Sequence, residues 1–217
     1  MLRSHVDHLT ITAPSLASGL EYVRQALGVT PQAGGEHPRM GTHNLLLKLG
    51  DSVFLEVISV NPEAPSPNRP RWYELDRPDL NSGPRLATWV VRTNDIGAAA
   101  AASPVSMGSI EPMSRGQLNW HITIPADGSL PLQGIVPTLI QWDSNPHPAS
   151  TLQNQGCSLV KLEGFHSEVD RVFGMLRSVG FRDGFSIFFL PQGKRPYLIA
   201  HIQTPAGLRK LGVPPPP

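Results

Sequence analysis

Cysteine is nearly absent from this chain, and so are most of the short motifs that identify an enzyme class. Cys157 is the only cysteine among 217 residues, so no internal disulfide can form. A reducing, cytoplasmic compartment is the simplest interpretation. The chain also lacks a Cys-x-x-Cys pair, a phosphate-cradling glycine loop, a Gly-x-Ser-x-Gly elbow and a His-Glu-x-x-His helix. These absences argue against nucleotide-cofactor enzymes, serine hydrolases and zinc proteases.

Charge of one sign and long apolar runs are scarce as well. The formal net charge is +1, and no basic run alternates with aromatic residues, so we expect no nucleic-acid partner. No apolar stretch approaches the roughly 18 residues of a membrane span, and the first eight residues carry charge where a signal peptide is apolar. With 40% hydrophobic and 16% charged residues, the composition predicts a globular protein that does not bind membranes.

Proline, by contrast, is abundant, with 23 residues. Several prolines fall in segments 61–70 and 146–150, which lack apolar periodicity and which we interpret as connectors. The chain ends in four consecutive prolines, a composition typical of a frayed polyproline tail.

The first 60 residues predict a strand, a helix and then further strands. Residues 6–12 alternate as a strand does. Ser15 is a plausible N-cap, an apolar stripe indicates a helix over 16–27, and Gly28 is suited to end it. Two further strands are predicted at 44–49 and 52–60 around a Gly-Asp turn.

The same order recurs twice, at a spacing of about 70 to 80 residues. Residues 86–92 predict a strand, Asn94 or Asp95 can cap an alanine-rich helix, and later strands are predicted at 117–124 and 135–142. A third copy begins at Ser158, with a strand at 159–162, a helix, and further strands at 185–190 and 197–203. The predicted organisation is a first βαβββ module at 1–62, a linker at 63–84, a second βαβββ-like module at 85–150, a third βαβ-type module at 151–210 and a disordered tail at 211–217.

Several short motifs resemble one superfamily. They are Val-Asp-His-Leu-Thr-Ile at 6–11, the helix with Leu-Gly-Val at 27–29, and Phe-Leu-Glu-Val-Ile at 54–58. Together they resemble the vicinal-oxygen-chelate superfamily, which includes glyoxalase I, extradiol dioxygenases and the bleomycin- and fosfomycin-resistance proteins. The resemblance implies an α+β fold, in which curved mixed sheets with outer helices surround a concave pocket.

A closer resemblance is to uncharacterised bacterial proteins with a glyoxalase-like domain. Its motifs are Glu-His-Pro at 36–38, Gly-Thr-His-Asn-Leu-Leu at 41–46, Met-Ser-Arg at 113–115, Leu-Asn-Trp at 118–120, Leu-Ile-Gln-Trp at 139–142 and Pro-His-Pro at 146–148. They extend over most of residues 5–205.

The resemblance implies a metal site with ligands on the first and last strands of each module. His8 and Glu56 hold these positions in the first module, and a carboxylate among apolar neighbours is costly unless it is paired. In the second module, counting places Thr88 opposite His8 and Gln141 opposite Glu56. We therefore expect a depleted site of His8, Glu56 and Gln141 for Zn, Mn, Fe or Ni. Recruitment of another histidine is open, the candidates being His43 and His121.

Other polar and aromatic residues are candidates for substrate binding. Arg115 could clamp a carboxylate or phosphate, and Trp120 could stack on a ring, although a surface arginine and a core tryptophan are the alternatives. Residues 42–44 could form a pocket edge or merely satisfy a local turn. The predicted substrate-binding set is Thr42, His43, Asn44, Arg115, Trp120 and His121.

Two functions are compatible with these patterns. One is a metal-dependent lyase, isomerase or dioxygenase acting on a small oxygen-rich substrate. The other is sequestration of a small ligand without chemistry, as in bleomycin-resistance proteins, and the incomplete second module favours it. In both cases the partner is a small molecule. The resemblance is also compatible with a homodimer, because superfamily members often pair modules across a dimer.

Overall fold

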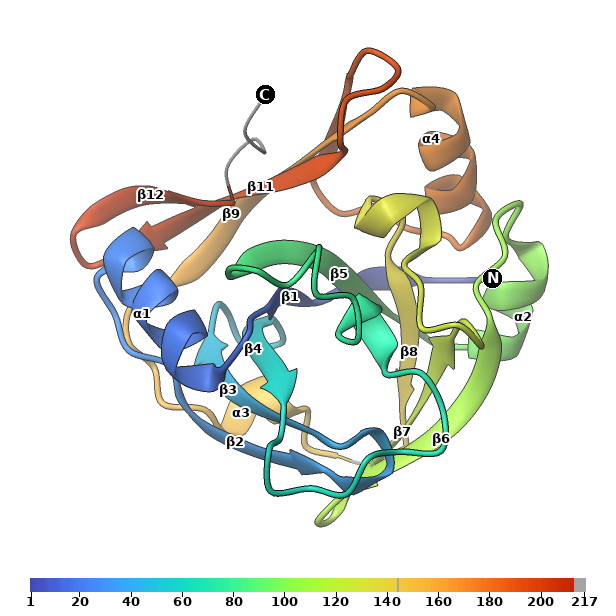
Figure 1. The fold of residues 1–217 in the computed structure, drawn as a ribbon. Helices are drawn as coiled ribbons and strands as arrows, with labels where there is room; N and C mark the ends of the chain where they lie inside the picture. Colours follow the sequence, from blue (N-terminus) through green and yellow to red (C-terminus); the bar gives the residue numbers. More distant parts are fainter. Residues whose placement is uncertain (144, 213–217) are drawn as a thin grey trace.

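The first module of the computed structural model begins with a strand and a capped helix (Figure 1). The structure describes residues 1–143 and 145–212, so most of the predicted tail lies outside the described residues. As predicted, Ser15 caps the helix by accepting the Ser18 backbone N–H, and Gly28 ends it with a left-handed φ of 74°. The elements are β1 (Ser4–Thr12), α1 (Leu16–Leu27), β2 (Gln32–His37), β3 (Thr42–Lys48) and β4 (Phe54–Val60).

The second module repeats this order. Its helix begins after Asp95, whose carboxylate accepts the Ala98 backbone N–H at 2.9 Å, as one predicted alternative had it. The elements are β5 (Arg85–Thr93), α2 (Ile96–Ala102), β6 (Ser109–Arg115), β7 (Leu118–Ile124) and β8 (Thr138–Trp142). Short helices lie in the connections: η1 (Pro38–Met40), η2 (Trp72–Glu74), η3 (Pro131–Gly134) and α3 (Pro148–Thr151).

The two modules share one eight-stranded sheet in the order β2-β3-β4-β1-β5-β8-β7-β6. In each module the first strand pairs parallel with the last, and the modules join where β1 and β5 pair antiparallel. The sheet curls until its end strands approach each other (Figure 1). There Arg39, next to β2, donates from Nη1 to the carbonyl of Pro112 in β6 at 2.8 Å. The predicted α+β fold with curved sheets is confirmed.

The strands that the sequence did not predict, β2, β6 and β12, lie at sheet edges. β2 contains Gly34 and Gly35, and β6 contains Pro112. Glycine and proline weaken an internal strand but are tolerated at an edge, where one side of the backbone has no ladder to complete. These strands are also more exposed, so their sequences lack the clear apolar alternation of a half-buried strand.

The third unit has a different strand order. Its elements are β9 (Ser158–His166), α4 (Val169–Ser178), β10 (Phe185–Phe189), β11 (Tyr197–Thr204) and β12 (Gly207–Leu211). They form a separate sheet in the order β10-β9-β11-β12, in which β9 pairs parallel with β10 directly after the helix. This βαβ unit packs on the main sheet through Trp89, whose ring stacks on Phe185 at 4.8 Å. No helix in the described part of the chain is long and apolar enough to cross a membrane.

Candidate functional site

A narrow pocket opens on the concave face of the eight-stranded sheet. Its volume is about 30 Å³, enough for one or two waters or an ion. A wider hollow of about 410 Å³ shares His37 and Arg115 with it. Both modules and η2 line the narrow pocket, with His8, His37, Asn44, Phe54, Glu56, Trp72, Tyr73, Arg115, Trp120, Ile122, Ile140 and Trp142.

A β-bulge at Asp7 shapes one wall of this pocket. In the pairing of β1 with β5, Val6 faces Val91 and His8 faces Val90, so Asp7 is an extra residue in β1. A bulge of this kind redirects side chains that simple alternation would send to opposite faces. Asp7 can therefore accept a hydrogen bond from its neighbour, with 2.6 Å between His8 Nδ1 and Asp7 Oδ1.

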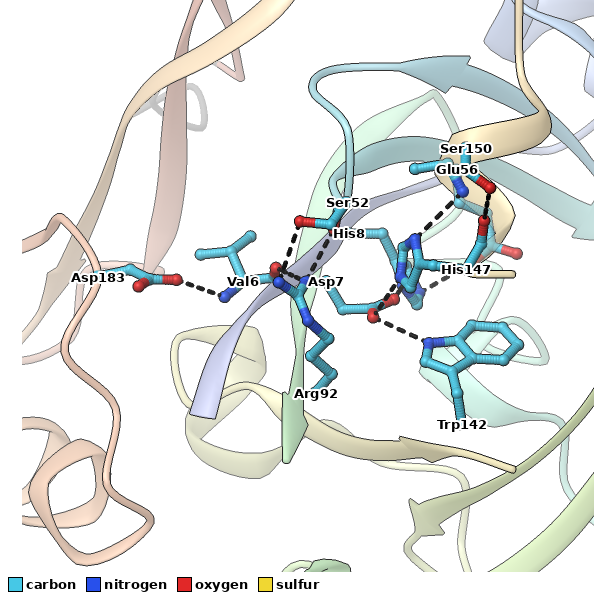
Figure 2. Close-up of polar contacts among 11 residues, drawn as sticks. Val6, Asp7, His8, Ser52, Glu56, Arg92, Trp142, His147, Ser150 and Asp183 are labelled. Atoms are coloured by element: carbon cyan, nitrogen blue, oxygen red, sulfur yellow. Dashed lines mark hydrogen bonds and ion pairs between the residues drawn. The ribbon is translucent and has the colours of Figure 1, made fainter. Parts of the chain in front are cut away.

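The buried carboxylate of Asp7 is the centre of a hydrogen-bond network (Figure 2). Its second oxygen accepts from Trp142 Nε1 and His147 Nε2, both at 2.9 Å. His147 Nδ1 in turn accepts the Ala149 backbone N–H at 3.2 Å, which fixes the proton of neutral His147 on Nε2. Burial acts to raise the pKa of Asp7, but hydrogen bonds from His147 and His8 outweigh it and hold that pKa well below its usual range.

Asp7 also determines which nitrogen of His8 is free. Because Nδ1 donates to Asp7, neutral His8 presents the lone pair of Nε2 to the pocket. Glu56 Oε2 lies 3.7 Å from that Nε2 atom. The ring of His8 is held by stacking on Phe54, with 4.5 Å between centroids. An orienting carboxylate behind a histidine is a common arrangement at metal sites.

Asn44 connects Glu56 to Arg115. The Asn44 amide donates to Glu56 Oε1 at 2.6 Å, and its oxygen accepts from Arg115 Nη1 at 3.1 Å and from the Gly35 backbone N–H at 2.9 Å. The glycines of β2 make room for this chain of contacts. A Cβ at Gly34 would lie 2.1 Å from Asn44 Oδ1, and one at Gly35 would lie 2.7 Å from Arg115 Cδ.

His37 is a buried, neutral histidine between the two hollows. Burial lowers the pKa of His37 to about 4; the positive charge of Arg115 acts in the same direction, and the negative charge of Glu56 opposes it. Its Nδ1 lies 3.1 Å from Thr42 Oγ1. Its ring packs edge to face with the ring of Trp72, with 5.1 Å between the ring centroids. It therefore offers the pocket an uncharged imidazole at neutral pH.

The structure separates the predicted site residues into two groups. His8, Glu56, Asn44, Arg115 and Trp120 line the pocket, and Thr42 supports it through His37. Three others lie elsewhere. Gln141 Oε1 accepts the Ile96 backbone N–H at 2.8 Å, His121 pairs with Asp143 at 2.9 Å, and His43 lies on β3 between Thr42 and Asn44 and does not line the pocket.

Strand register explains why Gln141 is displaced. β1 and β5 pair through His8 with Val90 and Thr10 with Thr88. When the second module is laid on the first, β5 takes the position of β1. Thr88 then lies at the position of His8, as predicted, and Val90 lies at the position of Thr10. Since Thr10 pairs with Glu56 and Val90 with Thr138, the counterpart of Glu56 is Thr138, whereas Gln141 points to the opposite face.

The sequence did not assign a site role to Asp7, His37, Trp142 or His147. Asp7 was hidden by the bulge, since regular alternation puts it opposite His8. A signal was nevertheless present, because an aspartate within an apolar strand needs partners. His147 caps α3, but its contact with Asp7 joins two segments that are far apart in the sequence, and no local pattern encodes it.

His8 and Glu56 are the pair that could hold a metal. Among the described residues, no group of three or more His, Cys, Asp or Glu side chains is arranged to hold an ion. A nitrogen and an oxygen 3.7 Å apart can both contact one ion at the usual distance of roughly 2.1 Å. The residues present therefore fit a two-ligand site in which other oxygens complete the coordination.

Comparisons with known proteins agree with this architecture. A family model described as a glyoxalase-like domain matches residues 6–180. No match was found among curated proteins. A hypothetical protein from Staphylococcus aureus is similar in structure, with 13% identity, a TM-score of 0.57 and coverage of 98% of this chain and 86% of the other.

Methylmalonyl-CoA epimerases are more distantly similar. A Streptomyces coelicolor enzyme in complex with 2-nitronate-propionyl-CoA has 20% identity and a TM-score of 0.46, covering 68% of this chain and 100% of its own. The Mycobacterium tuberculosis enzyme has 17% identity and a TM-score of 0.43, covering 67% and 91%. On the family match and the paired modules, the chain belongs to the glyoxalase-like domain family of the vicinal-oxygen-chelate superfamily.

Proposed function

We propose that this protein is a metal-dependent enzyme that acts on a small, oxygen-rich substrate in the pocket around His8 and Glu56. The observation that carries the proposal is the free Nε2 of His8, fixed by Asp7, which lies 3.7 Å from a Glu56 carboxylate oxygen. A bound Zn, Mn, Fe or Ni ion would polarise substrate oxygens at this place. His8 and Glu56 would hold the ion.

Arg115 and Asn44 have the chemistry to bind the substrate. Arg115 is half-buried and lines both the narrow pocket and the wider hollow. Its guanidinium could pair with a carboxylate or another anionic oxygen of the substrate. Such an ion pair is stronger in a partly buried site than in water. Asn44 orients Glu56 through a 2.6 Å hydrogen bond. The wider hollow offers room for the rest of the substrate next to the narrow metal-sized pocket.

Aromatic and apolar side chains exclude water from the opposite wall. Trp120, Ile122 and Ile140 are buried, and Trp142 is partly buried. A dry wall strengthens every electrostatic interaction in the pocket. The neutral imidazole of His37 at the boundary of the two hollows could hydrogen-bond a substrate hydroxyl or carbonyl.

Ligand sequestration without chemistry is the second candidate. The observation in its favour is that Thr88 and Thr138 occupy the places of His8 and Glu56 in the second module. Hydroxyl groups are poor ligands for transition metals. In this alternative, the same pocket binds a small ligand through Arg115 and the tryptophans.

Metal content of the purified protein distinguishes the two candidates. We expect protein prepared without chelators to contain Zn, Mn, Fe or Ni by elemental analysis, and His8→Ala and Glu56→Gln to lose it. His43→Ala is the matched control, because His43 does not line the pocket. If wild type binds none of the four ions at added micromolar concentration, the enzyme proposal is wrong and sequestration is favoured.

A further inference from the structure

A second cavity lies away from the His8–Glu56 pocket, where residues 79–85 meet the third unit. Its volume is about 240 Å³, and it shares no lining residue with the first pocket. α1, the segment before β5, η3 and β11 all contribute walls. The side chains used in the argument below are Tyr22, Arg85, Leu86, Ile135, Arg195 and Leu198.

Arg85 is an incompletely paired cation at this cavity. Its Nη2 donates to Glu74 Oε2 at 3.2 Å, and its Nε is buried without a hydrogen-bond partner. An unpaired buried donor is costly, which favours a further acceptor near the guanidinium. Burial lowers the pKa of Arg85; the negative charge of Glu74 opposes this shift, and the positive charge of Arg195 acts in the same direction as burial. Arg85 and Arg195 thus both line one cavity, and the positive charge of Arg195 acts on the guanidinium of Arg85.

The carboxylates nearby do not neutralise this pair. Asp79 is engaged by Arg77 through two hydrogen bonds of 3.1 and 3.0 Å, and Glu74 pairs with Arg85. The cluster thus contains three guanidinium groups, of Arg77, Arg85 and Arg195, and two carboxylates. One positive charge remains in excess, which matches a single anionic group.

The rest of the cavity is apolar. Leu86 and Leu198 are buried, as is Ile135, and the ring of Tyr22 is anchored because its hydroxyl accepts the Gly212 backbone N–H at 3.2 Å. Gln133 on the cavity wall has a left-handed φ of 55°, and strained non-glycine residues often cluster at ligand sites. An apolar pocket with a few converging polar groups is the usual form of a small-molecule site.

We propose that this cavity binds a small monocarboxylic acid with an apolar body. The carboxylate lies between the guanidinium groups of Arg85 and Arg195, and the body packs against Tyr22, Leu86 and Leu198. Two adjacent residues of η2 face the two cavities: Tyr73 lines the first pocket, and Glu74 accepts a hydrogen bond from Arg85, which lines the second. The second site does not depend on the proposed enzymatic function.

Phenylacetate is a suitable probe, and isothermal titration calorimetry of the full chain is the measurement. We expect saturable binding to wild type, at least tenfold weaker binding of the neutral isostere phenylacetamide, and a loss of about tenfold in Arg195→Gln, because a charged hydrogen bond is removed. Arg182→Gln is the matched control; it removes the same charge from another exposed position in the third unit and should bind as wild type does.

A second variant blocks the cavity without changing charge. Gly83 lines the cavity, and a Cβ there would meet no atom within 4 Å, so Gly83→Trp should fold and abolish binding. Glu56→Gln should leave phenylacetate binding unchanged. No saturable binding at millimolar phenylacetate, equal affinity for the amide, or a loss of binding in Glu56→Gln but not in Arg195→Gln would overturn the proposal.

Discussion

The two halves of the eight-stranded sheet have the same strand order but contribute different chemistry to one pocket. The first half supplies Asp7, His8, Asn44 and Glu56, which are all buried and hydrogen-bonded. The second half supplies mainly indole rings and isoleucines, with Arg115 at the edge. The two modules therefore place residues at equivalent positions around the pocket, but these residues are polar in one module and mostly apolar in the other.

Because the polar residues come from the first half of the sheet, buried charge is concentrated on one side of the pocket. Buried charges are tolerated only when they are paired and hydrogen-bonded, and Asp7 meets this condition through three donors. One of these donors, Trp142, belongs to the apolar half. The second half thus supports the polar half rather than duplicating it.

Removing the carboxylate of Asp7 should have the largest effect. Asp7→Ala leaves the donors on His8, Trp142 and His147 without their acceptor, and we expect a loss of about 4 kcal/mol in the free energy of unfolding. Urea denaturation measures it. Asp51→Ala is the control, because the fully exposed carboxylate of Asp51 forms a surface ion pair with Lys48, and its removal should change stability far less. Equal effects of the two variants would contradict a central role for Asp7.

Acid should destabilise the polar half through His37. Its pKa is about 4 when folded against an ordinary value of 6.5, so the unfolded chain binds the proton first. The contribution is fully present above pH 6.5 and is lost as the pH falls to 4, by about 3 kcal/mol at most. Urea titrations across this range should show a flatter pH dependence for His37→Gln.

A second histidine provides the comparison for that measurement. Burial also lowers the pKa of His166 in the third unit, so His166→Gln should independently make the stability less dependent on pH below 6.5. The two effects should add, because the residues lie in different sheets. An unchanged slope in His37→Gln would show that this histidine is not protected from protonation.

Trimming the apolar half should have the smallest effect. Ile140→Val removes one methylene from a buried side chain that lines the pocket, and we expect a loss of about 1 kcal/mol in stability. The metal content and the pH dependence of the free energy of unfolding should match those of wild type, since no polar group changes. If Ile140→Val lost metal, as Glu56→Gln is expected to do, the division between a polar half that holds the metal and an apolar half that only lines the pocket would be wrong.

Much of the fold could be predicted because its signals are local. The Ser15 cap, the apolar stripe of α1 and Gly28 define the first helix within 14 residues. The motif resemblance also put His8 on the first strand and Glu56 on the last strand of the first module. In the structure these strands, β1 and β4, pair in parallel. Gln141 could not be placed in the same way. Counting along the chain selected Gln141 instead of Thr138, and a shift by an odd number of residues puts a strand side chain on the opposite face.

The sequence by itself determined the repeated strand–helix–strand order and the caps of the first two helices, because these depend on cap residues and apolar periodicity within short windows. The resemblance of its motifs to the superfamily implied that His8 and Glu56 lie at the ligand positions of one module. Only the tertiary structure decided that a bulge turns Asp7 toward His8, that Trp142 and His147 reach Asp7 from more than 130 residues away, and that Arg85 and Arg195 share a cavity. Such contacts follow from sheet closure and the packing of the third unit, which no local pattern encodes.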